Sequence, residues 1–188
     1  LGNHNGGNGS TADYWVVKLD NNRNIVWQKC LGGSHEDGAS SAQQTSDGGY
    51  IITGFTFSNN YDVIGHHGPA GIGDYWVVKI NSEGIIQWQK CLGGTVDDRA
   101  NFIEQTSDGG YIITGQSAST DGNVTGNHGS YDYWVVKLEG CAITQPTITL
   151  NGVILESDMA TGNQWYYEGA PISGAINQTY TPTLNGYY

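Results

Sequence analysis

Basic residues are scarce in this sequence. Lys and Arg together number 7, whereas Asp and Glu number 18, and the formal net charge is −11. Nucleic acids and anionic membrane surfaces bind clusters of positive charge, so we exclude both as partners. The excess of carboxylates favours solubility, and it leaves one sharper possibility open, the binding of a divalent cation.

Long hydrophobic runs are also missing. No apolar stretch approaches the ~20 residues of a transmembrane helix, and no signal-peptide pattern is present. We therefore expect no membrane insertion. The chain opens in a Gly/Asn-rich loop over residues 1–10 and stops at Gly-Tyr-Tyr188, so we expect it to be a fragment of a larger protein.

Cysteine occurs only three times, and its spacing fits no zinc motif. Cys30 and Cys91 hold the same place in successive repeats, and Cys141 stands alone. Equivalent places in adjacent units are usually too far apart for a disulfide, which needs Cα atoms within about 7 Å. We therefore expect Cys30 and Cys91 to be small buried hydrophobic residues.

The patterns of common enzymes are absent as well. The sequence has no Gly-x-Ser-x-Gly elbow, no His-Glu-x-x-His and no phosphate-binding loop. Glycoside hydrolysis needs two carboxylates at a set separation, and nothing in the sequence selects such a pair. We predict no catalytic residues and no enzymatic activity.

What the sequence does contain is an internal repeat with a period of 61 residues. Three blocks return after that interval: 13–19 at 74–80, 27–33 at 88–94, and 44–54 at 105–115. The first block, Asp-Tyr-Trp-Val-Val-Lys, returns once more at 132–138. Such a period is typical of supersecondary units that need neighbours to bury their apolar faces.

Each repeat contains four segments with the composition of β-strands, rich in aromatic and β-branched residues. In the first repeat they are 13–19, 25–31, 39–45 and 50–57. Polar turns separate them, and the Asp-Gly of the last turn favours a primed hairpin turn.

Four strands per repeat are typical of one blade of a β-propeller. We therefore predict an all-β fold with propeller-like repeats at 13–73 and 74–131 and an extra strand at 132–138. Because propellers typically have 4–8 blades, these two visible blades would belong to a larger propeller or repeat array. The extra strand would complete a blade begun elsewhere in the chain, and the recurring Trp side chains would pack between blades.

The pattern changes after residue 140, which ends the repeat region 1–140. Residues 141–146 read as a linker, and residues 147–188 contain short alternating segments around Trp165. The central Trp and the later Gly-x-Tyr are similar to the tyrosine corner of immunoglobulin domains, although the Cys pair of antibody domains is absent. We predict a truncated Ig-like β-sandwich.

These motifs together resemble a known family. Asp-Tyr-Trp-Val-Val-Lys, Trp-Gln-Lys-x-Leu-Gly-Gly and Thr-Ser-Asp-Gly-Gly-Tyr-Ile-Ile-Thr-Gly resemble the repeats of large secreted and surface proteins of Bacteroidota, and Gly162-Asn-Gln-Trp165 resembles the Ig-like modules beside them. The resemblance implies propeller-like repeats, Ig-like modules and type IX secretion. It also implies an adhesive or structural role, which is what the repeats of that family are presumed to have.

Acidic residues recur in the loop that follows Gly-Gly, and they are the candidate calcium ligands. Adjacent carboxylates with backbone carbonyls could ligate Ca²⁺, which takes 6–8 oxygens. Asp121-Gly-Asn123 also resembles the start of a calcium loop, without the later Glu of an EF-hand. The alternative is that these side chains cap loop amides. The candidates are Glu36, Asp37, Asp97, Asp98, Asp121 and Asn123.

Histidine recurs before the Asp of the next Asp-Tyr-Trp, as His67 and His128. Several His residues with carboxylates could bind a transition metal. Equivalent residues on different blades converge only near the axis of a ring, so we favour a His that caps a turn or bonds the following Asp.

We therefore predict a non-enzymatic extracellular or cell-surface repeat protein that acts as an adhesion, display or structural scaffold. Its partners would be extracellular glycans, proteins or copies of itself. One alternative is a structural subunit of an extracellular fibre or surface layer whose open ends pair between chains. Another is the non-catalytic part of a secreted carbohydrate-active enzyme.

Overall fold

The structure, a computed structural model, describes residues 12–69, 71–140, 148–157, 165–168 and 170–183. These residues form fourteen strands and no helix, so the predicted all-β class is confirmed. In particular, they contain no helix that is long and apolar enough to span a membrane. The chain divides into two compact units, Leu1–Cys141 and Ala142–Tyr188. The opening loop, the linker at 141–146 and the final Gly-Tyr-Tyr lie outside the described residues.

The first unit has nine strands, which begin and end within two residues of the segments expected from composition. They are β1 (Tyr14–Leu19), β2 (Ile25–Leu31), β3 (Asp37–Gln44), β4 (Tyr50–Thr56), β5 (Asp74–Ile80), β6 (Ile86–Leu92), β7 (Asp98–Gln105), β8 (Tyr111–Ser117) and β9 (Asp132–Leu138).

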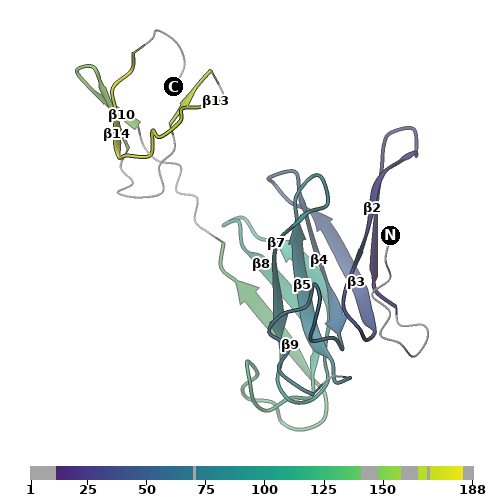
Figure 1. The fold of residues 1–188 in the computed structure, drawn as a ribbon. Coiled ribbons are helices and arrows are strands. Elements are labelled where there is room, and N and C mark those ends of the chain that lie inside the picture. The colour runs from purple at the N-terminus through teal and green to yellow at the C-terminus, as the bar shows by residue number, and fades with distance from the viewer. Residues whose placement is uncertain (1–11, 70, 141–147, 158–164, 169, 184–188) are drawn as a thin grey trace. The chain divides into compact units, whose positions relative to one another are not determined.

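These strands form three antiparallel sheets: a first sheet β1-β2, a middle sheet β3-β4-β5-β6 and a last sheet β7-β8-β9. Figure 1 shows the three sheets side by side, with the four-stranded sheet in the middle. The described residues do not close these sheets into a ring.

The sheets are out of phase with the sequence repeat, which corrects the expectation that the four strands of the repeat 13–73 form one blade. β1 and β2 lie in the first sheet, whereas β3 and β4 lie in the middle sheet. The physical reason is the pairing of β4, which hydrogen-bonds to β5 along its whole length, from Tyr50 opposite Ile80 to Thr56 opposite Asp74. The long loop 57–73 therefore joins two strands of one sheet, while the short Gly-Gly loop 32–36 crosses to the next sheet. β9 likewise pairs with β8, so it extends the sheet begun just before it.

The turn between β3 and β4 also differs from the primed type that Asp-Gly favoured. A type I′ turn needs positive φ at both central residues. Here only Gly48 has positive φ, +81°, and its N donates to Thr45 O at 2.9 Å, as in a type I turn followed by a left-handed glycine. Asp47 contributes through its side chain, because its Oδ1 accepts from Gly49 N at 3.0 Å and its Oδ2 pairs with Lys79 Nζ at 2.8 Å.

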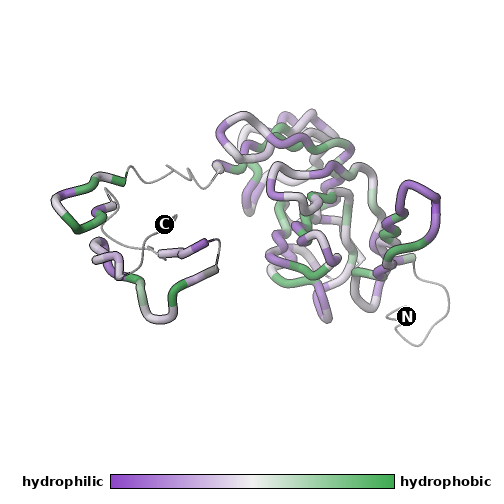
Figure 2. The backbone as a smooth tube through the Cα atoms, turned by 90° about the horizontal axis from the view of Figure 1, so that it is seen from above, coloured by the Kyte–Doolittle hydropathy of each residue, from purple (hydrophilic) through white to green (hydrophobic). Residues whose placement is uncertain are grey.

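The middle sheet is covered on both faces, and every residue of β5 is buried. Successive side chains of a strand point to opposite faces, so β5 contributes to two cores. Towards the first sheet the core contains Tyr14, Leu31, Ile52, Val63, Trp76, Val78, Ile80 and Cys91. Towards the last sheet it contains Ile51, Tyr75, Val77, Leu92, Ala100, Ile103, Tyr111 and Ile113. Figure 2 shows the resulting changes between hydrophobic and hydrophilic residues along the backbone of this unit.

The second unit contains two small antiparallel sheets, β10-β11-β14 and β12-β13. Its strands are β10 (Ile148–Asn151), β11 (Ile154–Ser157), β12 (Tyr166–Tyr167), β13 (Ala170–Pro171) and β14 (Thr179–Tyr180). Trp165 is buried, as expected for a central residue; its Nε1 donates to Asn177 O at 2.9 Å and its ring stacks on Tyr180. The residues around the expected tyrosine corner and at 158–164 lie outside the described residues.

Candidate functional site

The carboxylates that the sequence singled out for calcium lie at the Gly-Gly loops between sheets. Asp98 is fully buried, and its Oδ2 accepts hydrogen bonds from Gly94 N and Ser119 Oγ, each at 2.8 Å. Its Oδ1 accepts from the hydroxyl of Ser117. Asp37 makes the equivalent contacts in the preceding repeat, with Gly33, Thr56 and Ser58.

The acidic residues that precede these two aspartates in the sequence, Glu36 and Asp97, do not share the contacts of Asp37 and Asp98. Glu36 is exposed. Asp97 forms an ion pair with Arg99, with 2.7 Å between Oδ2 and Nε, and the same oxygen accepts a hydrogen bond from Tyr131 Oη at 2.8 Å. Adjacent carboxylates in the sequence are therefore not adjacent ligands in space.

Asp121 and Asn123 approach the Gly-Gly loop from the long loop that follows β8. Asp121 Oδ1 accepts from Thr95 N at 2.8 Å, and Asn123 Oδ1 accepts from Gly93 N at 3.3 Å. The same positions of the preceding repeat are Asn60 and Asp62, which bind Ser34 N at 2.9 Å and Gly32 N at 3.2 Å. The contact therefore recurs with the repeat.

Four of the six candidate calcium ligands bind the Gly-Gly loops: Asp98, Asp121 and Asn123 surround one loop, and Asp37 binds the other. Glu36 is exposed, and Asp97 pairs with Arg99. Most of their oxygens accept hydrogen bonds from loop amides and hydroxyls, which is the capping role. The described residues contain no group of three or more His, Cys, Asp or Glu that could bind a metal ion. Calcium binding stays a prediction.

The recurring histidines form pairs with the aspartates that follow them, as favoured from the sequence. His67 Nδ1 lies 2.8 Å from Asp74 Oδ2, and its backbone N donates to the same oxygen at 2.9 Å. His128 and Asp132 repeat both contacts, at 3.2 Å and 2.7 Å. Burial raises the pKa of the Asp74 carboxyl, and the bonds from His67 oppose that shift. Both pairs fix the end of a long loop to the strand that follows it.

The two described cysteines are free thiols, and Cys141 lies outside the described residues. Cys91 is buried in the core between the first and middle sheets, and burial raises the pKa of its thiol. Cys30 is only partly buried, and its Sγ donates to Asp13 Oδ2 at 3.3 Å. The expectation of a buried hydrophobic residue is confirmed for Cys91 alone.

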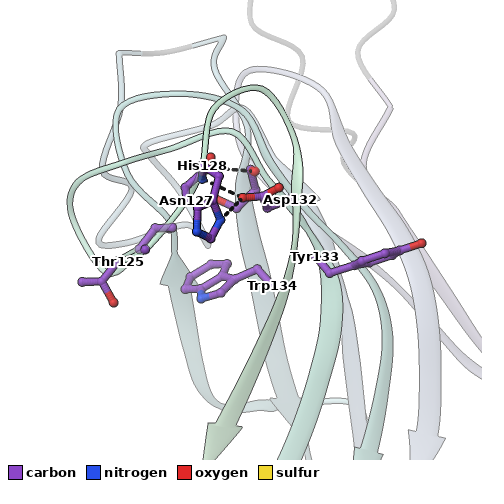
Figure 3. Close-up of a pocket in the computed structure, with 9 residues that line it drawn as sticks. Thr125, Asn127, His128, Asp132, Tyr133 and Trp134 are labelled. Atoms are coloured by element: carbon purple, nitrogen blue, oxygen red, sulfur yellow. Dashed lines mark hydrogen bonds and ion pairs between the residues drawn. The ribbon is translucent and has the colours of Figure 1, made fainter.

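A pocket of about 260 Å³ opens at the end of β8 and β9. Figure 3 shows His128 beside the ring of Trp134 on its wall, while Tyr133 points the other way. The lining residues are Ser117, Val124, Thr125, Gly126, Asn127, His128, Asp132, Tyr133 and Trp134.

In the middle sheet, the place equivalent to this pocket is occupied by a strand. There the strand β6 lies beside β5, and Gln89 bonds both sides of the equivalent place. Its Oε1 accepts from Trp76 Nε1 at 2.8 Å, and its Nε2 donates to Ile64 O at 3.0 Å. In the described residues of the last sheet β9 has no such neighbour. The pocket therefore corresponds to the place of a fourth strand.

Sequence reasoning missed the exposed aromatic residues at the two ends of the stack. The Asp-Tyr-Trp block is identical in all three strands, so it predicted the same packing for each. Yet Trp15 is 70% exposed and Tyr133 is 98% exposed, whereas Trp76 and Tyr75 are both 0% exposed. The exposed fractions of these equivalent residues differ because their strands lie at different positions in the stack.

The fold and these sites define an all-β protein built of stacked, repeating sheets, in which recurring polar residues hydrogen-bond to the loops between the sheets. No protein-family model matches the chain, and no curated protein matches it.

Proposed function

We propose that this chain is a non-enzymatic scaffold of the cell surface or extracellular space, serving adhesion or display. One observation carries the proposal: the recurring acidic and histidine side chains are hydrogen-bonded to the loops beside them or to one another. Asp98, Asp121 and Asp74 each accept a hydrogen bond from a backbone amide, and His67 also bonds Asp74 through its ring. Side chains that are engaged in this way have a structural role. A partner would therefore bind to surfaces outside these loops.

The finer architecture belongs to the same proposal. The three sheets would be part of a propeller-like array, and the second unit would be an Ig-like module. The support is the packing of a four-stranded sheet between two others through equivalent residues, Tyr14 against Trp76 and Tyr75 against Trp134. Together with the repeat motifs, this supports kinship with the secreted repeat proteins of Bacteroidota.

Attachment of living cells tests the function. Cells lacking the gene would be compared with cells that carry the wild-type gene or the double variant His67→Asn, His128→Asn. We expect deletion to reduce attachment to immobilised glycans and matrix proteins, and the double variant to restore it fully. Attachment that is unchanged by deletion, or that a folded double variant cannot restore, would contradict the scaffold.

A further inference from the structure

Two internal interfaces of the stack are built by the same pair of side chains. Tyr14 of the first sheet packs on Trp76 of the middle sheet, with ring centroids 4.6 Å apart and its Oη donating to Trp76 O at 3.2 Å. Tyr75 of the middle sheet packs on Trp134 of the last sheet in the same way, at 4.8 Å and 3.0 Å. Each Tyr thus faces the next sheet, and each Trp faces the previous one.

The last sheet presents the Tyr half of this contact on its outer face, which no other sheet of the described residues of this unit covers. Tyr133 occupies the position of Tyr75 and is 98% exposed, and Val135 occupies that of the buried Val77 and is 58% exposed. Figure 3 shows Tyr133 directed away from Trp134, the residue that packs on Tyr75 of the middle sheet.

The first sheet presents the Trp half of the same contact on its outer face. Trp15 occupies the position of Trp76 and is 70% exposed, and Leu19 occupies that of the buried Ile80 and is 52% exposed. Trp15 is already oriented, because its Nε1 donates to Gln28 Oε1 at 3.2 Å, as Trp76 Nε1 does to Gln89. The outer face of one end is therefore complementary to the outer face of the other.

We propose that the Tyr133 face of one copy of this chain docks on the Trp15 face of a second copy. The contact continues the two interfaces inside the chain, with Tyr133 packed on the ring of the second copy's Trp15. Because the two faces differ, the association is head-to-tail, and such contacts build rings or open filaments. The proposal rests on the scaffold function above and names its partner.

Aromatic residues at the centre of an interface contribute most of the binding energy. Tyr133→Ala and Trp15→Ala should therefore each weaken association by about tenfold or more. Both side chains are largely exposed within one copy, so both variants should fold as the wild type does. Ile64→Ala is the matched control, since Ile64 is also 70% exposed but lies on the loop between β4 and β5.

Sedimentation velocity of the purified full chain, in salt that screens its net charge, tests the proposal. The wild type and the Ile64→Ala variant should grow in mass with concentration, and at the concentration where they begin to do so the two aromatic variants should still be monomeric. A mixture of the two aromatic variants should form one-to-one pairs, because each supplies the face that the other lacks.

A wild type that stays monomeric would overturn the proposal. So would association that survives Tyr133→Ala or Trp15→Ala, or a mixture of the two variants that does not pair. These outcomes concern only the purified chain, so they are distinct from failure of the cell-attachment experiment.

Discussion

Arg23 occupies a backbone conformation that favours glycine. Its φ is +67°, and Gly84, the equivalent residue 61 positions later, has φ +75°. Both follow the same turn geometry, with Arg23 N donating to Asp20 O at 3.0 Å and Gly84 N to Asn81 O at 3.0 Å. L-residues in this region are strained, whereas glycine is not.

Replacement of Arg23 by glycine should therefore stabilise the protein. We expect Arg23→Gly to raise the free energy of unfolding by about 0.5–1 kcal/mol, the relief of strain less the added entropy of the unfolded chain. Gly84→Arg is the reciprocal variant and should lose about 1 kcal/mol or more. Urea unfolding midpoints measure both, and a lower midpoint for Arg23→Gly would contradict the turn geometry.

Cys30 is partly exposed and should nevertheless react slowly. Burial, and next the hydrogen bond to Asp13, raise the pKa of its thiol to about 11. At pH 8 only about one thiol in a thousand is then the reactive thiolate. We expect its alkylation rate, followed by peptide mass spectrometry, to rise about tenfold per pH unit until pH 11. A plateau near pH 9 would show that the thiol is unperturbed.

At the scale of elements, the Gly-Gly loops depend on their buried aspartates. Asp98→Ala leaves Gly94 N and the hydroxyls of Ser117 and Ser119 without their acceptor, so we expect a loss of about 3 kcal/mol in the free energy of unfolding. Glu36→Ala, at an exposed site, should change it by less than about 0.5 kcal/mol. If Asp98 caps the loop, the Asp98→Ala variant should lose the same free energy of unfolding in chelator as in calcium. A loss that appears only with calcium would make Asp98 a metal ligand.

The open edge of β9 should accept a strand. A peptide with the sequence of β6 (Ile86–Leu92) should bind it, because Gln89 would bridge the Thr125 carbonyl and Trp134 as it bridges their counterparts. The same peptide with Gln89→Ala should bind more weakly. Amide chemical shifts of β9 provide the measurement, and binding that leaves β9 unshifted would contradict this use of the pocket.

Strand composition predicted these elements well, and it failed at their connections. The strand-like segments of the first repeat located β1 to β4 to within two residues, and the 61-residue period placed their counterparts β5 to β8. Sequence identity of the repeats could not show that β4 pairs with β5 across a long loop, because pairing is decided by chain connections and sheet packing. The Asp-Gly of the β3–β4 turn likewise suggested the wrong turn, because Asp47 does not take the positive φ of a primed turn and its carboxylate instead accepts from Gly49 N and pairs with Lys79.

For the molecule as a whole, the sequence predicted that the recurring residues build the unit, and it could not show where the repetition ends. Trp15 and Trp76 stand in the same motif, yet one is largely exposed and the other is buried. Exposure depends on which neighbour is present, and that information lies outside a single repeat. The repeat's Tyr and Trp side chains are therefore most exposed at the two ends of the stack, which are the surfaces that we propose for docking.

Hydroxyl-radical footprinting of the full chain tests this central claim most directly, because it reports the exposure of each Trp and Tyr side chain. In dilute solution, Trp15 and Tyr133 should be oxidised rapidly, while Trp76 and Tyr75 should be protected. In concentrated solution, Trp15 and Tyr133 should become protected as well. Oxidation of Trp76 and Tyr75 as fast as that of Trp15 and Tyr133 would contradict the stack of sheets itself.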